Sequence, residues 1–132
     1  MLKGSCLCGK IAYHYEGEID EISMCHCQQC QKAQGSAFAA VAPIKSSAFT
    51  ITQGEEFLSS FRATPDKVRV FCQACGSPIY SARDNLPEFK RLRVGTLDTP
   101  VEASKKYHAF ISSKAPWFSV HDGLPQFERF KT

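Results

Sequence analysis

The sequence predicts a small, mostly β single domain with short helical turns. Apolar residues alternate with polar ones over short stretches, which is the period of a strand rather than of a helix. Glycine and proline separate these stretches at short intervals. The chain has 132 residues, enough for one domain with its own hydrophobic core. We therefore expect residues 1–132 to form one unit.

The expected strands follow one another with little between them. Each is alternating or apolar over the length of a strand, and together they cover residues 10–17, 22–24, 37–42, 49–52, 58–62, 68–71, 78–81 and 92–97. Residues 49–52 and 58–62 predict a hairpin with its turn near 53–55. The strand at 37–42 is expected to end at Pro43, which has no amide proton for a strand ladder.

One short helix and one irregular region complete this outline. Residues 28–33 predict one or two helical turns that end at Gly35, because glycine readily adopts the left-handed conformation that closes a helix. Residues 98–132 are rich in aromatic side chains, and prolines and a glycine interrupt any helix there. We expect Trp117 and the phenylalanines of this region to lie in the core.

Seven cysteines fall into three clusters. The first and third clusters share a pattern that ends in glycine, and they contain Cys6, Cys8, Cys72 and Cys75. The middle cluster contains Cys25, Cys27 and Cys30. A glycine after the last cysteine permits a tight turn whose backbone N–H groups point at the sulfurs. Two such turns make one closed four-sulfur site, and the middle cluster makes a separate three-sulfur site.

These cysteines are expected to bind metal rather than to form disulfides. The N-terminus lacks the apolar stretch of a signal peptide, and no apolar run is long enough to cross a bilayer. We therefore expect a cytoplasmic protein, whose thiols stay reduced. Disulfides between the outer clusters are the alternative. Tetrahedral sulfur sites favour zinc, so we expect two Zn²⁺ per chain, with the second site partly empty.

The middle cluster is the candidate for chemistry. A Cys-x-Cys turn followed by Cys-x-x-Cys lets three sulfurs converge and leaves the fourth position of a zinc ion open. Cys25, Cys27 and Cys30 are therefore the expected catalytic metal ligands. The alternative is a second structural site, completed by a side chain such as His26 or His108.

The charge of the chain gives no reason to expect a nucleic acid partner. The formal net charge of +3 assumes neutral cysteines. Metal-bound thiols are deprotonated, so seven thiolates and two Zn²⁺ would bring the total to zero. Two pairs of basic residues, Lys105 with Lys106 and Arg91 with Arg93, are expected on solvated faces. A basic group near the middle cluster would nevertheless suit a substrate carboxylate.

Six segments stand out in chain order. They are residues 4–9 (GSCLCG), 25–32 (CHCQQCQK), 71–77 (FCQACGS), 95–98 (GTLD), His108 with the apolar pair after it, and 114–117 (KAPW). Together they resemble the glutathione-dependent formaldehyde-activating enzymes and their relatives, the GFA/CENP-V domain family. The resemblance spans nearly the whole chain.

This resemblance implies a zinc-stabilised Mss4-like (β-tent) architecture. It implies a structural zinc on the outer four cysteines and a functional zinc on the middle three, the same partition that the spacing favours. It also implies a carbon–sulfur lyase that joins formaldehyde to the thiol of glutathione or releases it. A small thiol such as glutathione and a small aldehyde are therefore the expected partners, with no membrane and no nucleic acid.

A mechanism follows as a hypothesis. The thiol is expected to bind at the open position of the second zinc, lose its proton there and add to the neighbouring aldehyde. His26, His108 and Asp98 are the candidates for donating a proton to the new alkoxide. In the simpler interpretation His26 is exposed, His108 is a hydrogen-bonded core residue and Asp98 caps a turn. Three thiolates leave the zinc centre negatively charged, which suits thiol binding better than water activation.

Two other functions fit the same cysteines. One is a non-catalytic zinc-binding module that recruits a protein or a nucleic acid. The absence of a basic tail from this sequence argues against that function. The other is a thiol or zinc stress sensor, in which oxidation of the middle cluster releases its metal.

Overall fold

The computed structural model describes residues 1–130, which form ten strands and one α-helix. The strands are β1 (Leu2–Ser5), β2 (Ala12–Tyr15), β3 (Glu21–Cys25), β4 (Ala39–Lys45), β5 (Phe49–Gln53), β6 (Leu58–Thr64), β7 (Lys67–Cys72), β8 (Pro78–Arg83), β9 (Phe89–Arg93) and β10 (Lys105–Ala109). The helix α1 spans Gln28–Gln34. Short 3₁₀ turns cover Ser46–Ala48, Glu55–Phe57, Val94–Thr96 and Ile111–Ser113. The prediction of a small, mostly β domain with short helical turns is confirmed.

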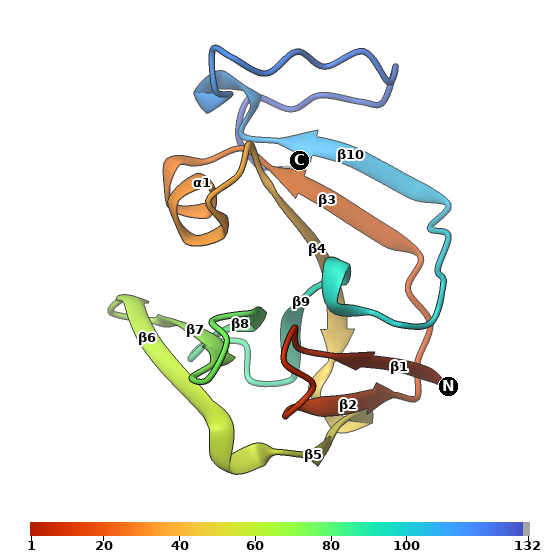
Figure 1. Cartoon of the computed structure of the whole chain (residues 1–132). Coiled ribbons are helices and arrows are strands. Elements are labelled where there is room, and N and C mark those ends of the chain that lie inside the picture. The colour runs from red at the N-terminus through yellow and green to blue at the C-terminus, as the bar shows by residue number, and fades with distance from the viewer. Residues whose placement is uncertain (131–132) are drawn as a thin grey trace.

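Two sheets carry the fold. β1, β2 and β5 form a three-stranded sheet, and the other seven strands form a sheet in the order β10-β3-β4-β9-β8-β7-β6. Neighbouring strands are antiparallel, except for β10 and β3, which are parallel. Figure 1 shows that the strand direction changes markedly across the larger sheet, with α1 and β6 on the same side of β4. The larger sheet is therefore curved.

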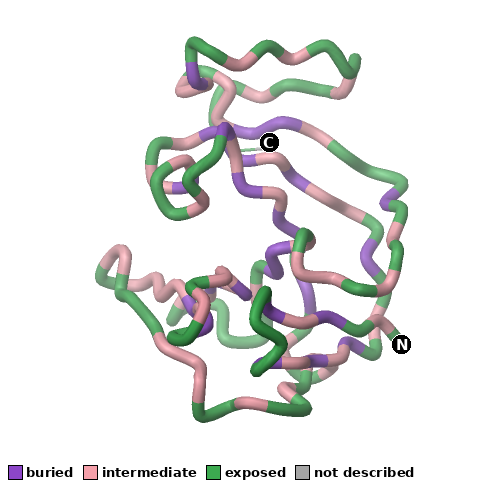
Figure 2. Tube along the Cα trace, in the orientation of Figure 1, coloured by how far each residue is buried: buried purple, intermediate pink, exposed green. Residues whose placement is uncertain are grey.

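The main hydrophobic core fills the space between the two sheets. Tyr13 and Tyr15 of β2 reach it from the smaller sheet, and Ile44 of β4 and Leu92 of β9 reach it from the larger one. All four side chains are buried, and Figure 2 shows buried segments along β4. Because side chains alternate along a strand, the residues between these core positions point to the other face of the larger sheet.

The predicted end of the helix is confirmed, whereas the predicted end of the strand after it is wrong. Gly35 closes α1 in the left-handed conformation (φ 60°, ψ 38°), as the sequence predicts. Pro43, however, does not end β4, which continues to Lys45. Beyond Val41, β4 pairs only with β9 and no longer with β3. Pro43 therefore lies where one side of the strand needs no amide donor.

The expected hairpin of residues 49–62 is also wrong in its pairing. Both strands form, but β5 pairs with β2 and β6 pairs with β7, in different sheets. The chain crosses from one sheet to the other at Gly54, which has a positive φ of 78°. A Cβ atom at this position would lie 1.9 Å from the carbonyl oxygen of Lys10. Gly54 therefore packs closely against the chain before β2 and does not lie in the turn of a hairpin.

The region expected to be irregular contains β10, which pairs in parallel with β3 so that Ala109 lies opposite Cys25. Lys105 and Lys106 are exposed, as expected, and they mask the strand pattern in the sequence. The strand expected at 92–97 ends earlier, because β9 gives way to a 3₁₀ turn. Within residues 1–130, no helix has the length and apolar character needed to span a bilayer.

Candidate functional site

The outer four cysteines converge between the two sheets. The turn that carries Cys6 and Cys8 follows β1, and the turn that carries Cys72 and Cys75 joins β7 to β8. All four sulfur atoms lie within 4.8 Å of one another. Each turn contains a glycine of positive φ, 78° in the first and 80° in the second. The structure therefore brings together the four thiols that the sequence pattern groups.

The sulfur separations fit one tetrahedral metal ion. Cys6 Sγ and Cys8 Sγ lie 3.6 Å apart, and Cys8 Sγ and Cys72 Sγ lie 3.8 Å apart. Four thiolates bound to zinc at about 2.3 Å lie about 3.8 Å from one another. Disulfide sulfurs are much closer, at about 2.05 Å. All seven cysteines are free, so the disulfide alternative finds no support.

Hydrogen bonds favour the thiolate form at Cys6 and Cys75, while desolvation and the neighbouring cysteines raise the pKa of Cys8 to about 11. The Ser77 hydroxyl lies 3.3 Å from Cys75 Sγ. Hydrogen bonds from this hydroxyl and from the Ser77 backbone N–H lower the pKa of Cys75 to about 5. The backbone N–H of Ile11 donates to Cys6 Sγ at 3.3 Å. The donor set of the cluster therefore fits zinc in its sulfur ligands and their geometry.

The middle three cysteines, hereafter the trio, converge where β3 turns into α1. Cys25 is the last residue of β3, Cys27 caps α1 and Cys30 lies in its first turn. Cys27 keeps an extended backbone (φ −66°, ψ 156°), and its Sγ accepts from the Cys30 N–H at 3.3 Å. The three sulfurs lie within 4.8 Å of one another. Within residues 1–130 no histidine nitrogen or carboxylate oxygen joins this group.

The electrostatic environment singles out one sulfur of the trio. Hydrogen bonds from Cys25 and Cys27, and then from Arg69 of β7, lower the pKa of Cys30. The Arg69 guanidinium donates to Cys30 Sγ at 3.8 Å and to Gln29 Oε1 at 2.8 Å. The pKa of Cys25 is raised, first by hydrogen bonds with Cys27 and Cys30 and then by burial. Negative charge is thus favoured at Cys30, next to a fixed cation.

A cavity of about 400 Å³ opens beside the trio. Apart from the three cysteines, two unlike groups of side chains line most of it. The basic group comes from β7, β8 and β9 and consists of Lys67, Arg83, Arg91 and Arg93. The mostly apolar group comes from β4, β10 and the segment after β10, and consists of Val41, Tyr107, Ala109, Phe110 and Phe130. The cavity can therefore hold a molecule that has an anionic part and an apolar part.

Arg93 corrects the expectation of a solvated face. It is only 5% exposed, and it donates to Gln34 Oε1 of α1 at 3.2 Å and to the Arg91 carbonyl at 3.0 Å. Burial lowers the pKa of Arg93 to about 10. Arg91 is exposed as expected and also lines the cavity. Pairs of basic residues two positions apart in β7 and β9, with Arg83 in β8 between them, were the sequence signal for this wall, because residues two positions apart share one face of a sheet.

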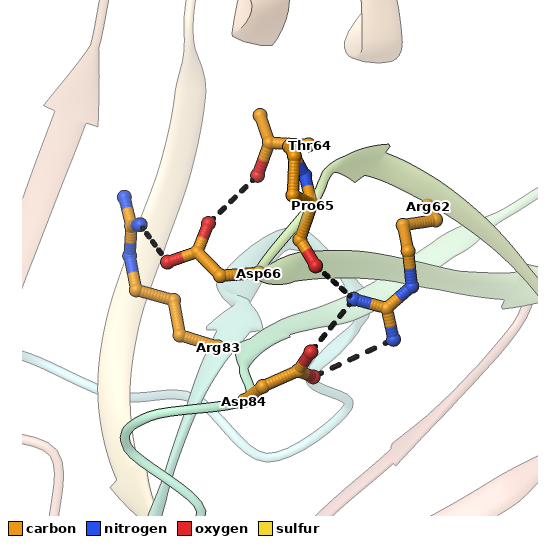
Figure 3. A network of polar contacts seen from close by, with 6 residues as sticks. All are labelled: Arg62, Thr64, Pro65, Asp66, Arg83 and Asp84. Carbon is orange, nitrogen blue, oxygen red and sulfur yellow. Dashed lines mark hydrogen bonds and ion pairs between the residues drawn. The ribbon is translucent and has the colours of Figure 1, made fainter.

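A network of polar contacts holds the end of the β6–β7 hairpin beside the cavity (Figure 3). Asp66 accepts from the Thr64 hydroxyl at 2.9 Å and from Arg83 at 3.3 Å. The Thr64 hydrogen bond and then the charge of Arg83 lower the pKa of Asp66. Arg62 forms an ion pair with Asp84 at 2.8 Å. The network thus fixes Arg83 at the rim of the cavity.

Two histidines and an aspartate form a hydrogen-bonded chain that does not line the cavity. His26 Nε2 lies 2.8 Å from His108 Nδ1, and His108 Nε2 lies 2.8 Å from Asp122 Oδ2. Since a carboxylate accepts, His108 donates through Nε2, and in its neutral form it accepts from His26 at Nδ1. His108 is a hydrogen-bonded core residue as predicted. The prediction of an exposed His26 is wrong, because its ring is fully buried beside Phe38 and Phe118.

The remaining expected residues also lie outside the cavity, with one exception. Asp98 accepts from the Ser5 hydroxyl at 2.7 Å, so it ties the loop after β9 to β1. None of the three expected proton donors therefore lines the cavity. Trp117 and Phe130 are 71% and 66% exposed, so the expectation that they lie in the core is wrong. Phe130 lines the cavity, because its ring packs on Phe110 with centroids 4.8 Å apart.

The chain is similar to known proteins over much of its length. The family model described as glutathione-dependent formaldehyde-activating enzyme matches residues 1–113. A protein of Schizosaccharomyces pombe named as an uncharacterized lyase is 31% identical over 90 aligned positions, and the match covers 63% of this chain and 58% of that protein. The chain thus spans less than two thirds of that relative.

The fold also has a counterpart among solved structures. The crystal structure of a Rhodobacter sphaeroides protein superposes with a TM-score of 0.63 and covers 74% of this chain and 89% of its own. The two sequences are 23% identical. At this identity the likeness concerns the fold.

Proposed function

Because this chain belongs to the family of glutathione-dependent formaldehyde-activating enzymes, we propose that it is a zinc-dependent carbon–sulfur lyase acting in the cytoplasm. Its reaction is the formation or cleavage of an adduct between a thiol, such as glutathione, and a small aldehyde. The lyase name of the yeast relative supports the reaction class. The observation that carries the proposal is the convergence of three sulfurs beside a cavity with a basic wall.

The two cysteine clusters have different roles in this proposal. The closed four-sulfur cluster holds a structural zinc, and Cys25, Cys27 and Cys30 hold the zinc that serves the reaction. When bound by three thiolates, zinc favours the ionised form of a thiol ligand and orients it beside a carbonyl group. The absence of a fourth ligating side chain within residues 1–130 supports a position open to the substrate.

The residues around the trio bind and orient the substrate. Phe110 and Tyr107 contribute apolar surface that limits the access of water to the adduct. Arg91 and Arg93 supply guanidinium groups, which recognise carboxylates through paired hydrogen bonds. Because one cavity holds both reactants, their addition becomes an effectively unimolecular step.

Lys67 is the cavity residue that we assign to proton transfer. Burial, and then the positive charge of Arg69, lowers the pKa of its ammonium group. A lowered pKa makes Lys67 Nζ a better proton donor to the alkoxide that forms when a thiolate adds to an aldehyde. The same nitrogen takes the proton back when the adduct is cleaved. His26, His108 and Asp98 have no such access to the cavity.

Exchange spectroscopy tests this function. NMR would follow the exchange of formaldehyde between its free form and its glutathione adduct, with zinc-loaded wild type and with Cys27→Ser. Serine retains an N-cap oxygen for the Cys30 N–H, so the variant changes the metal site with little change to α1. Acceleration by the wild type and its loss in the folded variant are expected. Equal exchange rates with and without wild-type protein, for glutathione and for other small thiols, would contradict the proposal.

A further inference from the structure

Strand register places five basic side chains on one face of the larger sheet. We call this set the basic face, and it consists of Lys67, Arg69, Arg83, Arg91 and Arg93. Lys67 lies opposite Arg83, while Arg69 and Arg91 lie on either side of Ser81. Residues directly opposite one another in antiparallel strands share a face. Five cations of one sign on adjacent strands therefore repel one another.

The basic face continues into the trio. Arg93 lies opposite Val41 of β4, and Val41 lies opposite Ser23 of β3. Ser23 and Cys25 are two positions apart in β3, so they point to the same side. A molecule held on the basic face is therefore on the same side of the sheet as the sulfurs of the trio.

The protein supplies few anions to balance this charge. Arg83 pairs with Asp66, and Arg69 contacts the sulfur of Cys30. Among residues 1–130, Arg93 donates only to uncharged oxygens although it is almost fully buried. Within residues 1–130, no ion pair involves Lys67 or Arg91. Buried charge without a partner is costly, which points to an anion bound from outside.

The remaining charge favours a doubly charged ligand. Within residues 1–130, Asp66 is the one carboxylate that forms an ion pair with the basic face, so four of its five cations have no carboxylate partner. A carboxylate would balance one of them and a phosphate monoester would balance two.

We propose that the basic face binds the phosphate group of a phosphorylated substrate, and that the apolar wall of the cavity receives the rest of that molecule. The substrate would be an aldehyde, a thiol or their adduct that carries a phosphate monoester. This substrate class rests on the proposed function, because the chemistry takes place at the trio. The binding of the phosphate group does not depend on turnover.

Two matched probes test the inference. Phenyl phosphate and benzoate share an aromatic ring, and at about pH 7.5 the first is a dianion and the second a monoanion. Calorimetry at constant ionic strength would compare their affinities for the zinc-loaded protein. Phenyl phosphate is expected to bind about tenfold more tightly or better. Equal affinities would overturn the inference.

Variants identify where the dianion binds. Arg91→Gln, at an exposed position, is expected to weaken phenyl phosphate about tenfold. Lys106→Gln removes an exposed cation of β10, next to the cavity-lining Tyr107 but on the opposite face, and should leave the affinity unchanged. Equal losses in the two variants would indicate only general charge attraction and overturn the inference. Loss of binding in Cys27→Ser would place the anion at the metal and overturn it as well.

These outcomes separate the two proposals. A protein that accelerates thiol–aldehyde exchange but does not prefer phenyl phosphate contradicts the phosphate site alone. A protein that binds phenyl phosphate through Arg91 but accelerates no exchange contradicts the proposed function alone.

Discussion

Replacement of one exposed cysteine is expected to cost as much stability as the loss of a core side chain. Cys8 is exposed, and its side-chain contacts are with the sulfurs of Cys6 and Cys72. An ordinary surface substitution changes the free energy of unfolding by about 0.5 kcal/mol or less. If the outer cysteines hold zinc, Cys8→Ser instead removes a ligand from the clamp that joins the start of the chain to the β7–β8 turn.

The expected magnitude follows from the length of the loop that this clamp closes. Cys8 and Cys72 are 64 positions apart. By analogy with a disulfide, a cross-link over such a loop lowers the entropy of the unfolded chain by an amount worth about 4 kcal/mol. For a domain of this size, such a loss lowers the melting temperature by roughly 15 °C. Cys27→Ser opens only a short local loop, so its expected cost is about 2 kcal/mol or less.

Denaturant unfolding of the zinc-loaded wild type and the two variants would measure these differences. Zinc content, measured by mass spectrometry on the same samples, is expected to fall from about two ions per chain to about one in each variant. A Cys8→Ser protein that loses one zinc and keeps the stability of the wild type would refute the structural role of the clamp. Equal destabilisation by the two variants would refute the division into structural and functional sites.

Three further substitutions test the fold around the site. Tyr13→Phe removes a partly buried hydrogen bond of 2.6 Å to Thr96 and should cost about 1 kcal/mol in denaturant unfolding. Gly54→Ala puts a Cβ 1.9 Å from the Lys10 carbonyl oxygen at a positive φ, so it should lower the melting temperature far more than alanine at an ordinary loop glycine does. Asp66 has a lowered pKa in the folded state, so its carboxylate stabilises the fold above the ordinary value of 3.8 and this contribution is lost as the pH falls further. The stability difference between wild type and Asp66→Asn should therefore shrink on acidification below 3.8, and a constant difference would contradict this assignment.

The grouping of the cysteines could be predicted because its signals are local. Each outer turn has a glycine directly after its second cysteine. The trio lies within six residues, where a strand passes into a helix. Such turns depend on nearby backbone conformation, which short sequence patterns describe well. The end of α1 at Gly35 was predictable for the same reason.

Features that depend on distant pairing could not be predicted in the same way. β10 forms because β3, some eighty residues earlier, offers it a parallel partner, and its exposed lysines hide the strand pattern. His26 is buried because the alternation of β3 directs Cys25 to the cavity and the next side chain to the opposite side. The burial of Arg93 likewise depends on α1, whose Gln34 covers it.

The central claim is that one sulfur site is closed and the other is open to a thiol. Cadmium-113 NMR of the protein loaded with cadmium at both sites tests it directly, since cadmium takes the same thiolate ligands as zinc. Two resonances are expected, and glutathione should shift only the one that disappears in Cys27→Ser. A glutathione titration that leaves both resonances in place, or that shifts only the one lost in Cys8→Ser, would contradict the account.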